Sequence, residues 1–136
     1  MDFEKDMEQI SLFCRLHSKL KNQNNIRNSE MGLLIYIERN YSIKPIQAAE
    51  YFGIQKSAVT AMVTSLTEQG YLEKSLNDND RRSYLISLTK KGKNIVQSTY
   101  TEYHRLVVLL SEKLGLRKYE AFMELMNEAN IILKEE

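Results

Sequence analysis

The stretch Asp80-Arg-Arg-Ser-Tyr-Leu-Ile-Ser-Leu-Thr-Lys-Lys-Gly92 decides how the rest of the chain is interpreted. In it, a charged turn leads into a strand and then into the start of a helix. The apolar residues Tyr84, Ile86 and Leu88 alternate with polar positions and predict the strand, although Leu85 breaks the polar face. Thr89 is suited to cap the helix that follows. The segment therefore predicts one arm of a β-hairpin that runs directly into a helix.

The tip of this hairpin is charged. Asp80 and Arg82 lie two residues apart beside a predicted turn at Asn77–Asp80, so the carboxylate can orient the guanidinium at an exposed position. An arginine held in this way, with Arg81 beside it, can enter the minor groove of DNA. A solvated tip whose charges only keep a strand edge soluble explains the same residues. This segment alone does not decide between the two interpretations.

Two short helices joined by a tight turn are predicted before the hairpin. Pro45 suits the first turn of a helix that ends near Gly53, and a second helix runs from about Gln55 or Lys56 to Gln69. Such a pair is a helix-turn-helix.

The close crossing of these two helices requires three residue types in a fixed order. It needs a small residue on the first helix, a residue that tolerates positive φ at the turn, and a branched apolar anchor on the second. Ala49, Gly53 and Val59 meet these requirements. The same spacing arises by chance in many helical hairpins, so it supports the motif without proving it.

The second helix of the pair presents small and polar residues on one face, and these can approach base edges and phosphates in a major groove. The candidates for DNA contact are Gln55, Lys56, Ser57, Thr60 and Thr64, and Ala61 lies on the same face. Ordinary solvated helix positions have the same composition. Gln55 can also serve only as a cap of the helix.

Helices are predicted on both sides of this segment. The first runs from Phe3 to about Lys21, and polar residues 22–25 end it. Ser29 is the expected cap of the next helix. The apolar face of that helix consists of Leu33, Leu34, Ile37 and Tyr41. A long helix follows Thr89, and a last helix follows Gly115.

We therefore expect one domain over residues 1–136, mainly α-helical with a small β-hairpin wing. Residues 29–93 would form a winged helix-turn-helix lobe, and residues 1–28 and 94–136 a helical dimerisation region. The first and last helices carry more apolar residues than a small lobe can cover, so two copies should bury them in a two-fold dimer. An elongated monomer with its own helical bundle is the alternative.

The charge distribution agrees weakly with nucleic-acid binding. The net charge is only +1, but residues 53–93 carry seven Lys and Arg against four Asp and Glu. Residues 94–136 carry five against seven, and residues 1–52 carry seven of each. An asymmetry of this size also arises by chance.

Other classes of protein find little support in the sequence. With Cys14 as the single cysteine and two isolated histidines, neither a disulfide nor a metal or other cofactor is expected. No nucleophile or acid–base pair stands at a suggestive spacing, so we do not expect an enzyme. The acidic N-terminus and the short aliphatic run Leu106–Leu110 predict neither a signal peptide nor a membrane span, and hence a cytoplasmic location.

From about Ile43 to Gly92 the chain resembles the MarR family of bacterial and archaeal winged-helix regulators. The resemblance rests on Lys56-Ser57-Ala58-Val59-Thr60, on Leu66 with Gly70-Tyr71-Leu72, on Asp80-Arg81-Arg82, and on Leu88-Thr89-Lys90-Lys91-Gly92. It implies a homodimeric repressor or activator, with repressor preferred, that binds double-stranded DNA at an inverted repeat. By position, Arg82 would be the minor-groove arginine and Asp80 its partner. Gln55-Lys56 replaces the commoner Ser-Pro at the start of the recognition helix, which leaves the operator and the affinity open.

The resemblance also raises the question of regulation. In this family a cleft between the dimerisation helices and the DNA-binding lobe often takes small aromatic acids or phenols. Candidate lining residues are His17, Tyr36, Tyr41 and Tyr103, although each also suits a core or an interface.

Two alternatives remain open at this point. Some relatives sense peroxides through a first-helix cysteine, but Phe13 and Leu16 predict that Cys14 is buried and inert. A winged-helix interaction module that does not bind DNA is the other alternative.

Overall fold

The computed structural model of the chain describes residues 1–18, 26–77 and 80–136, with only the backbone described for residues 18, 77 and 80–82. The predicted end of the first helix at Lys21, the polar break at 22–25 and the turn residues 78–79 lie outside the described residues. The elements are α1 (Phe3–Ser18), α2 (Asn28–Asn40), β1 (Ser42–Ile43), α3 (Pro45–Phe52), α4 (Lys56–Glu68), β2 (Leu72–Asn77), β3 (Asp80–Leu88), α5 (Lys90–Leu114) and α6 (Leu116–Lys134).

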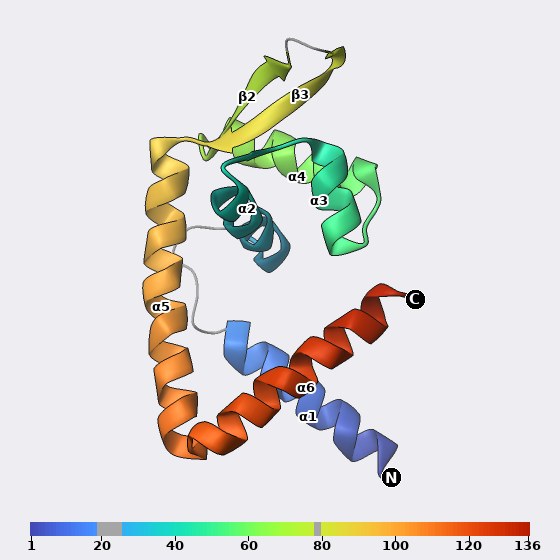
Figure 1. The fold of residues 1–136 in the computed structure, drawn as a ribbon, viewed down its shortest axis with the longest axis vertical. Helices are drawn as coiled ribbons and strands as arrows, with labels where there is room; N and C mark the ends of the chain where they lie inside the picture. The colour runs from blue at the N-terminus through green and yellow to red at the C-terminus, as the bar shows by residue number, and fades with distance from the viewer. Residues whose placement is uncertain (19–25, 78–79) are drawn as a thin grey trace.

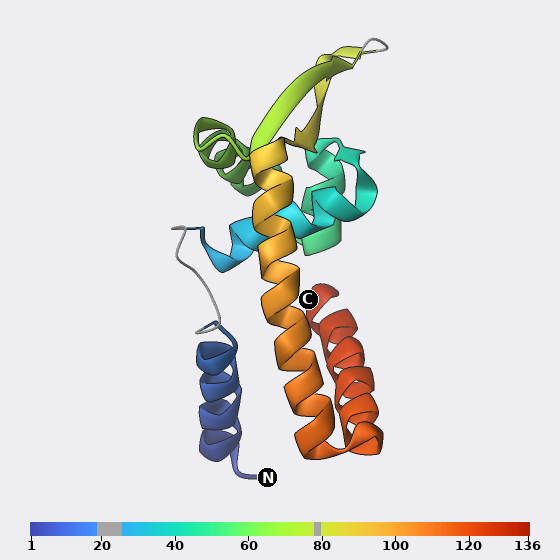
Figure 2. The same cartoon turned by 90° about the vertical axis from the view of Figure 1, so that its left-hand side faces the viewer.

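These elements form two regions, which we call the lobe and the stem. The lobe consists of α2, α3, α4 and the sheet, from which the β2–β3 hairpin projects as a wing (Figure 1). The stem consists of α1, α5 and α6, and α5 runs from the base of the wing to the far end of the molecule (Figure 2). The predicted fold, mainly helical with a small wing, is confirmed.

The sheet includes a short strand that the sequence pattern did not reveal. The strand order is β1-β3-β2, with both neighbours antiparallel to β3. Ile43 of β1 pairs with Ile86 of β3, and both side chains are fully buried. A strand of two residues is too short for an alternating pattern to be recognised.

The core of the molecule lies in the lobe. Its largest fully buried side chains come from Ile26 before α2 and from α2, α4, the sheet and the first half of α5. They are Ile26, Leu33, Leu34, Ile37, Ile43, Val59, Val63, Leu66, Ile86 and Val96. Each such side chain contributes about 1.5–3 kcal/mol relative to an exposed one. In contrast, α6 contains no buried residue.

Two predictions about α2 were wrong. The helix begins at Asn28, so Ser29 lies inside it rather than at the cap. The side chain of Glu30 instead reaches back and accepts a hydrogen bond from the Arg27 backbone N–H at 3.0 Å, which satisfies a donor at the helix start. Tyr41 was expected on the apolar face, but it is 87% exposed because the helix ends at Asn40 and Tyr41 turns away with φ of 67°.

The end of α4, the base of the wing and the start of α5 meet at one place, which we call the junction (residues 69–71 and 89–92). The Thr89 hydroxyl donates to the Gly70 carbonyl oxygen at 2.6 Å and accepts from the Gly92 N–H at 3.1 Å. The Thr89 N–H donates to the Tyr71 carbonyl oxygen at 3.0 Å. The predicted cap at Thr89 is therefore confirmed. It also ties α5 to the chain that leaves α4.

Gly92 leaves no room for a side chain at the junction. A Cβ atom at this position would overlap the carbonyl oxygen of Tyr71, which is a backbone atom and cannot rotate away. This close approach explains why the chain has glycine in the first turn of α5.

We expect Gly92→Ala to lower the free energy of unfolding by about 1–3 kcal/mol, because the methyl group forces α5 away from Tyr71. Gly32→Ala is the matched control. Gly32 is also helical, its added Cβ would lie 3.7 Å from the Phe52 ring, and alanine favours the helix by about 1 kcal/mol. Urea unfolding monitored by circular dichroism measures both. Equal stability of the two variants would contradict the close approach at Gly92.

Candidate nucleic-acid interface

Helix α4 buries one face in the lobe and exposes the opposite face. Val59, Val63 and Leu66 are fully buried. The exposed face consists of Gln55, Lys56, Ser57, Thr60, Ala61 and Thr64, which are the positions that the sequence predicted to be accessible. Because these side chains are small or polar, the helix can approach base edges closely when it lies in a DNA major groove.

The helix-turn-helix has the geometry that its three marker residues predicted. Ala49 is buried where α3 approaches α4, Gly53 has φ of 65°, and Val59 is fully buried. The Ile54 N–H donates to the Ala49 carbonyl oxygen at 3.0 Å, which closes the end of α3. The turn is thus held by backbone hydrogen bonding as well as by the apolar core.

Hydrogen bonding limits what two side chains on the exposed face can do. The Thr60 hydroxyl donates to the Lys56 carbonyl oxygen at 3.0 Å, so it can act toward a ligand only as an acceptor while that bond persists. Gln55 occupies the N-cap position, but its side chain makes no capping hydrogen bond. Its amide can therefore both donate and accept toward a ligand.

The wing projects from the same end of the molecule as α4. The backbone of Asp80 pairs with Asn77, and β3 continues through Arg81 and Arg82. The side chains of these three charged residues lie outside the described part of the structure. The orientation of Arg82 by Asp80 therefore stays a prediction.

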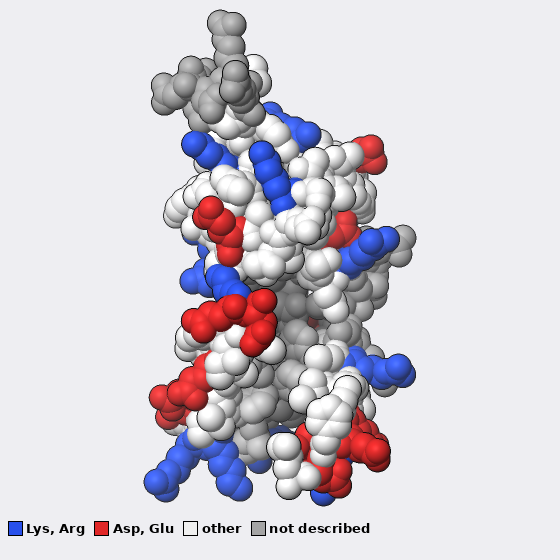
Figure 3. Space-filling view, turned by 90° about the vertical axis from the view of Figure 1, so that its right-hand side faces the viewer, with Lys and Arg blue, Asp and Glu red and all other residues white. Residues whose placement is uncertain are grey.

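Some of the basic residues in this region contact tyrosine rings. The Lys91 ammonium donates to the Gln69 carbonyl oxygen at 2.7 Å and lies 4.6 Å from the centroid of the Tyr71 ring. The Lys74 ammonium lies 4.9 Å from the centroid of the Tyr84 ring. On the face shown in Figure 3, Lys and Arg side chains are seen below the wing, and the largest groups of Asp and Glu lie farther from it.

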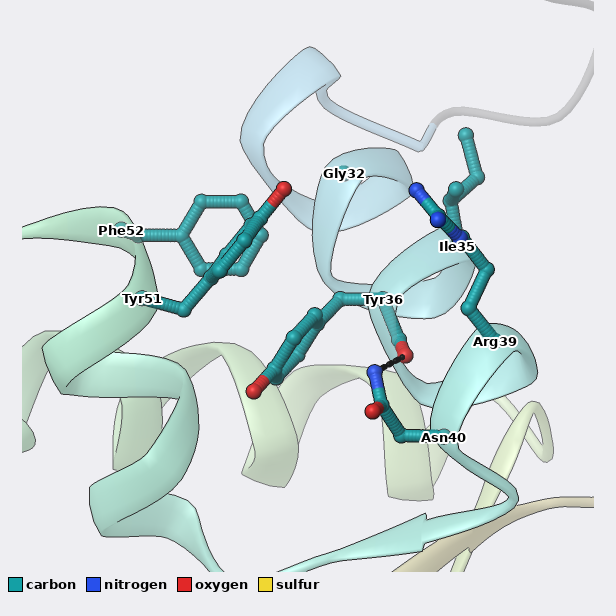
Figure 4. A pocket seen from close by; sticks show the side chains of 7 residues that line it. All are labelled: Gly32, Ile35, Tyr36, Arg39, Asn40, Tyr51 and Phe52. Atoms are coloured by element: carbon teal, nitrogen blue, oxygen red, sulfur yellow. Dashed lines mark hydrogen bonds between the residues drawn. The ribbon is translucent and has the colours of Figure 1, made fainter. Parts of the chain in front are cut away.

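A pocket of about 550 Å³ lies between α2 and α3 (Figure 4). It is lined by Gly32, Ile35, Tyr36, Arg39, Asn40, Tyr51 and Phe52. The Tyr36 and Tyr51 rings are stacked, with centroids 4.4 Å apart and planes 13° apart. Of these residues, the sequence predicted only Tyr36 as a ligand contact. Tyr36 and Arg39 are three residues apart and so share one face of α2, which could have indicated Arg39 as well, but no local pattern connects them to Tyr51.

The four predicted ligand residues do not line one cleft. His17 and Tyr103 lie together, with ring centroids 5.4 Å apart between α1 and α5. Phe13 extends this cluster to Phe122 of α6 at 5.7 Å. Tyr36 instead lines the pocket between α2 and α3, and the side chain of Tyr41 is exposed.

Cys14 is exposed in the single chain, so the prediction that it is buried was wrong. Its neighbours Phe13 and Leu16 are themselves 39% and 50% exposed. The prediction failed because it assumed that apolar neighbours would be covered by the same chain.

In the part of the chain that the structure describes, no group of three or more His, Cys, Asp or Glu side chains is placed to hold a metal ion. Among the same residues, no helix is long and apolar enough to cross a membrane.

Comparison with known proteins agrees with this architecture. Residues 25–83 match the model of the MarR family. The uncharacterised helix-turn-helix transcriptional regulator YwhA of Bacillus subtilis is 26% identical over 106 residues, which cover 78% of this chain and 74% of that protein. The transcriptional repressor MprA of Escherichia coli is 27% identical over 100 residues, which cover 72% of this chain and 57% of that protein.

A solved structure extends the likeness to nearly the whole fold. The crystal structure of Streptococcus pneumoniae FabT in complex with DNA superposes with a TM-score of 0.82 at 20% identity, covering 98% of this chain and 99% of that one. The segment that matches the family model, residues 25–83, spans α2, the helix-turn-helix, β2 and the first part of β3. The chain is similar to the MarR family of winged helix-turn-helix transcriptional regulators, whose model matches its residues 25–83.

Proposed function

We propose that the protein is a sequence-specific repressor that binds an inverted-repeat operator as a homodimer. The observation that carries this proposal is the exposed face of α4, where small and polar side chains stand opposite a fully buried apolar face. Each α4 would enter a major groove through Lys56, Ser57, Thr60 and Thr64, with Gln55 at its start. Arg82 would enter the flanking minor groove, with Asp80 and Arg81 beside it. The similar FabT structure is a complex with DNA, which supports DNA binding. The similar protein MprA is a transcriptional repressor, which supports repression.

The apolar surface of the stem supports the dimer. Phe3 and Ile10 of α1 are 66% and 65% exposed, and Leu125 and Leu133 of α6 are 64% and 72% exposed. Helices with this much exposed apolar surface are usually covered by another chain. A second copy related by a two-fold axis would cover them and place two α4 helices for the two half-sites of an inverted repeat.

The pocket between α2 and α3 is our candidate for the site of a small aromatic or phenolic effector. The stacked Tyr36 and Tyr51 rings provide an apolar wall, and the exposed Arg39 lies among the lining residues as a cation that can pair with a carboxylate. The proposed dimer would have two forms that differ in the distance between their α4 helices. An effector in this pocket releases DNA only if it binds these two forms with unequal affinity.

One observation favours a second candidate, a dimeric interaction module that does not bind DNA. The basic surface is thin, and Lys91 is engaged in the junction rather than projecting freely toward a partner. The two functions differ in their salt dependence, because binding to DNA releases counterions and weakens steeply as salt rises.

We predict that Lys56→Ala weakens operator binding and lowers the log–log salt slope by about one, because one phosphate contact is lost. The operator would first be selected from a random duplex library. Fluorescence anisotropy between 50 and 200 mM salt, roughly the range over which such contacts are resolved, measures the slope. Lys113→Ala, at the far end of α5, is the matched control and should leave the slope unchanged. An unchanged slope in Lys56→Ala would remove this residue from the interface.

We predict that Arg82→Ala costs about 1–3 kcal/mol of operator affinity and leaves the oligomeric state unchanged. The loss should be concentrated at the flanking positions of the operator, where the minor groove lies. Selection from the same library, with analytical ultracentrifugation of both proteins, measures the two effects. If the variant enriches the same sequences with the same affinity, the wing does not take part in recognition.

We predict that a phenolic acid such as salicylate binds in the pocket, and that Arg39→Ala abolishes this binding while operator affinity without the acid stays unchanged. Calorimetric titration of the wild type and the variant measures the affinity. His17→Ala tests the other aromatic cluster. Loss of binding in His17→Ala with retention in Arg39→Ala would move the effector site to the contact between α1 and α5.

A further inference from the structure

The last helix returns the chain to the lobe. Gly115, with φ of 88°, ends α5 and begins α6, which packs back along α5. A helix of 19 residues spans about 28 Å, enough to carry its end from the far pole of the stem to the lobe. Figure 1 and Figure 2 both show the C-terminal end of α6 below the lobe, on the side of α3.

At this end, Lys134 contacts the helix-turn-helix in two ways. Its aliphatic stem lies against the turn, since a Cβ atom built on Gly53 would be 3.7 Å from Lys134 Cγ and 4.0 Å from the Lys134 carbonyl oxygen. Its ammonium lies 4.9 Å from the centroid of the Tyr51 ring. Tyr51 is the last residue but one of α3, and its ring is stacked on Tyr36 of α2. Lys134 therefore contacts both the turn before α4 and the aromatic pair that joins α2 to α3.

We propose that Lys134 is a positioning residue for DNA recognition, which holds the helix-turn-helix against the end of α6 and so sets the tilt of α4 relative to the stem. This proposal rests on the proposed function. Lys134 would act through the lobe, without touching DNA.

The lobe and the stem are attached to each other at more than one place. The lobe is joined to α5 at the junction and where α2 packs against the first half of that helix, and attachment along this one helix leaves the lobe able to rotate about it. The contact of Lys134 lies at the turn between α3 and α4, away from the junction, and opposes that rotation. In a two-fold dimer, the tilt of each lobe sets the distance between the two α4 helices, and hence the preferred spacing of the half-sites.

The chemistry of the contact suggests substitutions that separate its parts. A lysine ammonium over a tyrosine ring is held by the negative face of the ring, and arginine can take its place. Lys134→Met keeps an unbranched stem against Gly53 and removes the charge, whereas Lys134→Arg keeps the charge. Tyr51→Leu removes the ring. Lys118→Met, in the first turn of α6, is the matched control.

The first readout is the affinity for selected operators whose half-sites are moved together or apart by one base pair. At an exposed contact of this type, Lys134→Met and Tyr51→Leu should each lower affinity for the best spacing by about two- to five-fold. Both should reduce the preference for that spacing by a similar factor. Lys134→Arg and Lys118→Met should behave as the wild type, and the double variant Lys134→Met/Tyr51→Leu should be no weaker than either single variant.

The second readout needs no DNA. Hydrogen exchange of the backbone N–H groups in the turn between α3 and α4 and in the last turn of α6 should be faster in Lys134→Met than in the wild type. Unchanged exchange would overturn the contact. Faster exchange with an unchanged spacing preference would overturn the positioning role, as would full additivity of the two substitutions. If the wild type selects no operator, the proposed function fails, and exchange still shows whether α6 holds the turn.

Discussion

The approach of Gly92 to the Tyr71 carbonyl group is the constraint on which the rest of the molecule depends. Around it, the Thr89 hydroxyl bridges Gly70 and Gly92, and Lys91 covers the last turn of α4. Four segments are thereby fixed at one place: the end of α4, the start of β2, the end of β3 and the start of α5. A change in the direction of α5 is consequently transmitted to both α4 and the wing.

The sequence predicted the features that are encoded by neighbouring residues. Ala49, Gly53 and Val59 lie within residues 49–59, and the cap at Thr89 acts within the first turn of α5, so the geometry of both follows from nearby residue types. The errors concern features that depend on distant parts of the chain. Strand β1 exists only because β3 lies beside it, and the exposure of Cys14 depends on what covers α1. The same holds for the pocket, whose Tyr51 wall comes from another helix.

Three lysines show why a count of charges predicted the candidate interface only in part. Lys74, Lys91 and Lys134 each lie over a tyrosine ring, at 4.9, 4.6 and 4.9 Å from the centroid. The partners of Lys91 and Lys134 lie 20 and 83 positions away in the sequence, too far for a local pattern to connect them. Their ammonium groups stabilise the architecture as well as adding positive charge. The exposed face of α4 was easier to predict, because helical periodicity alone separates it from the core.

The two-residue strand β1 gives the wing a mechanical root. Ser42 and Ile43 pair with the inner end of β3, and they lie directly between the end of α2 and Pro45 at the start of α3. Force applied to the outer part of the hairpin would therefore be divided between the stem and the first helix of the helix-turn-helix. In the proposed complex with DNA, a movement of the wing would therefore be transmitted through the paired residues Ile43 and Ile86 to the start of α3.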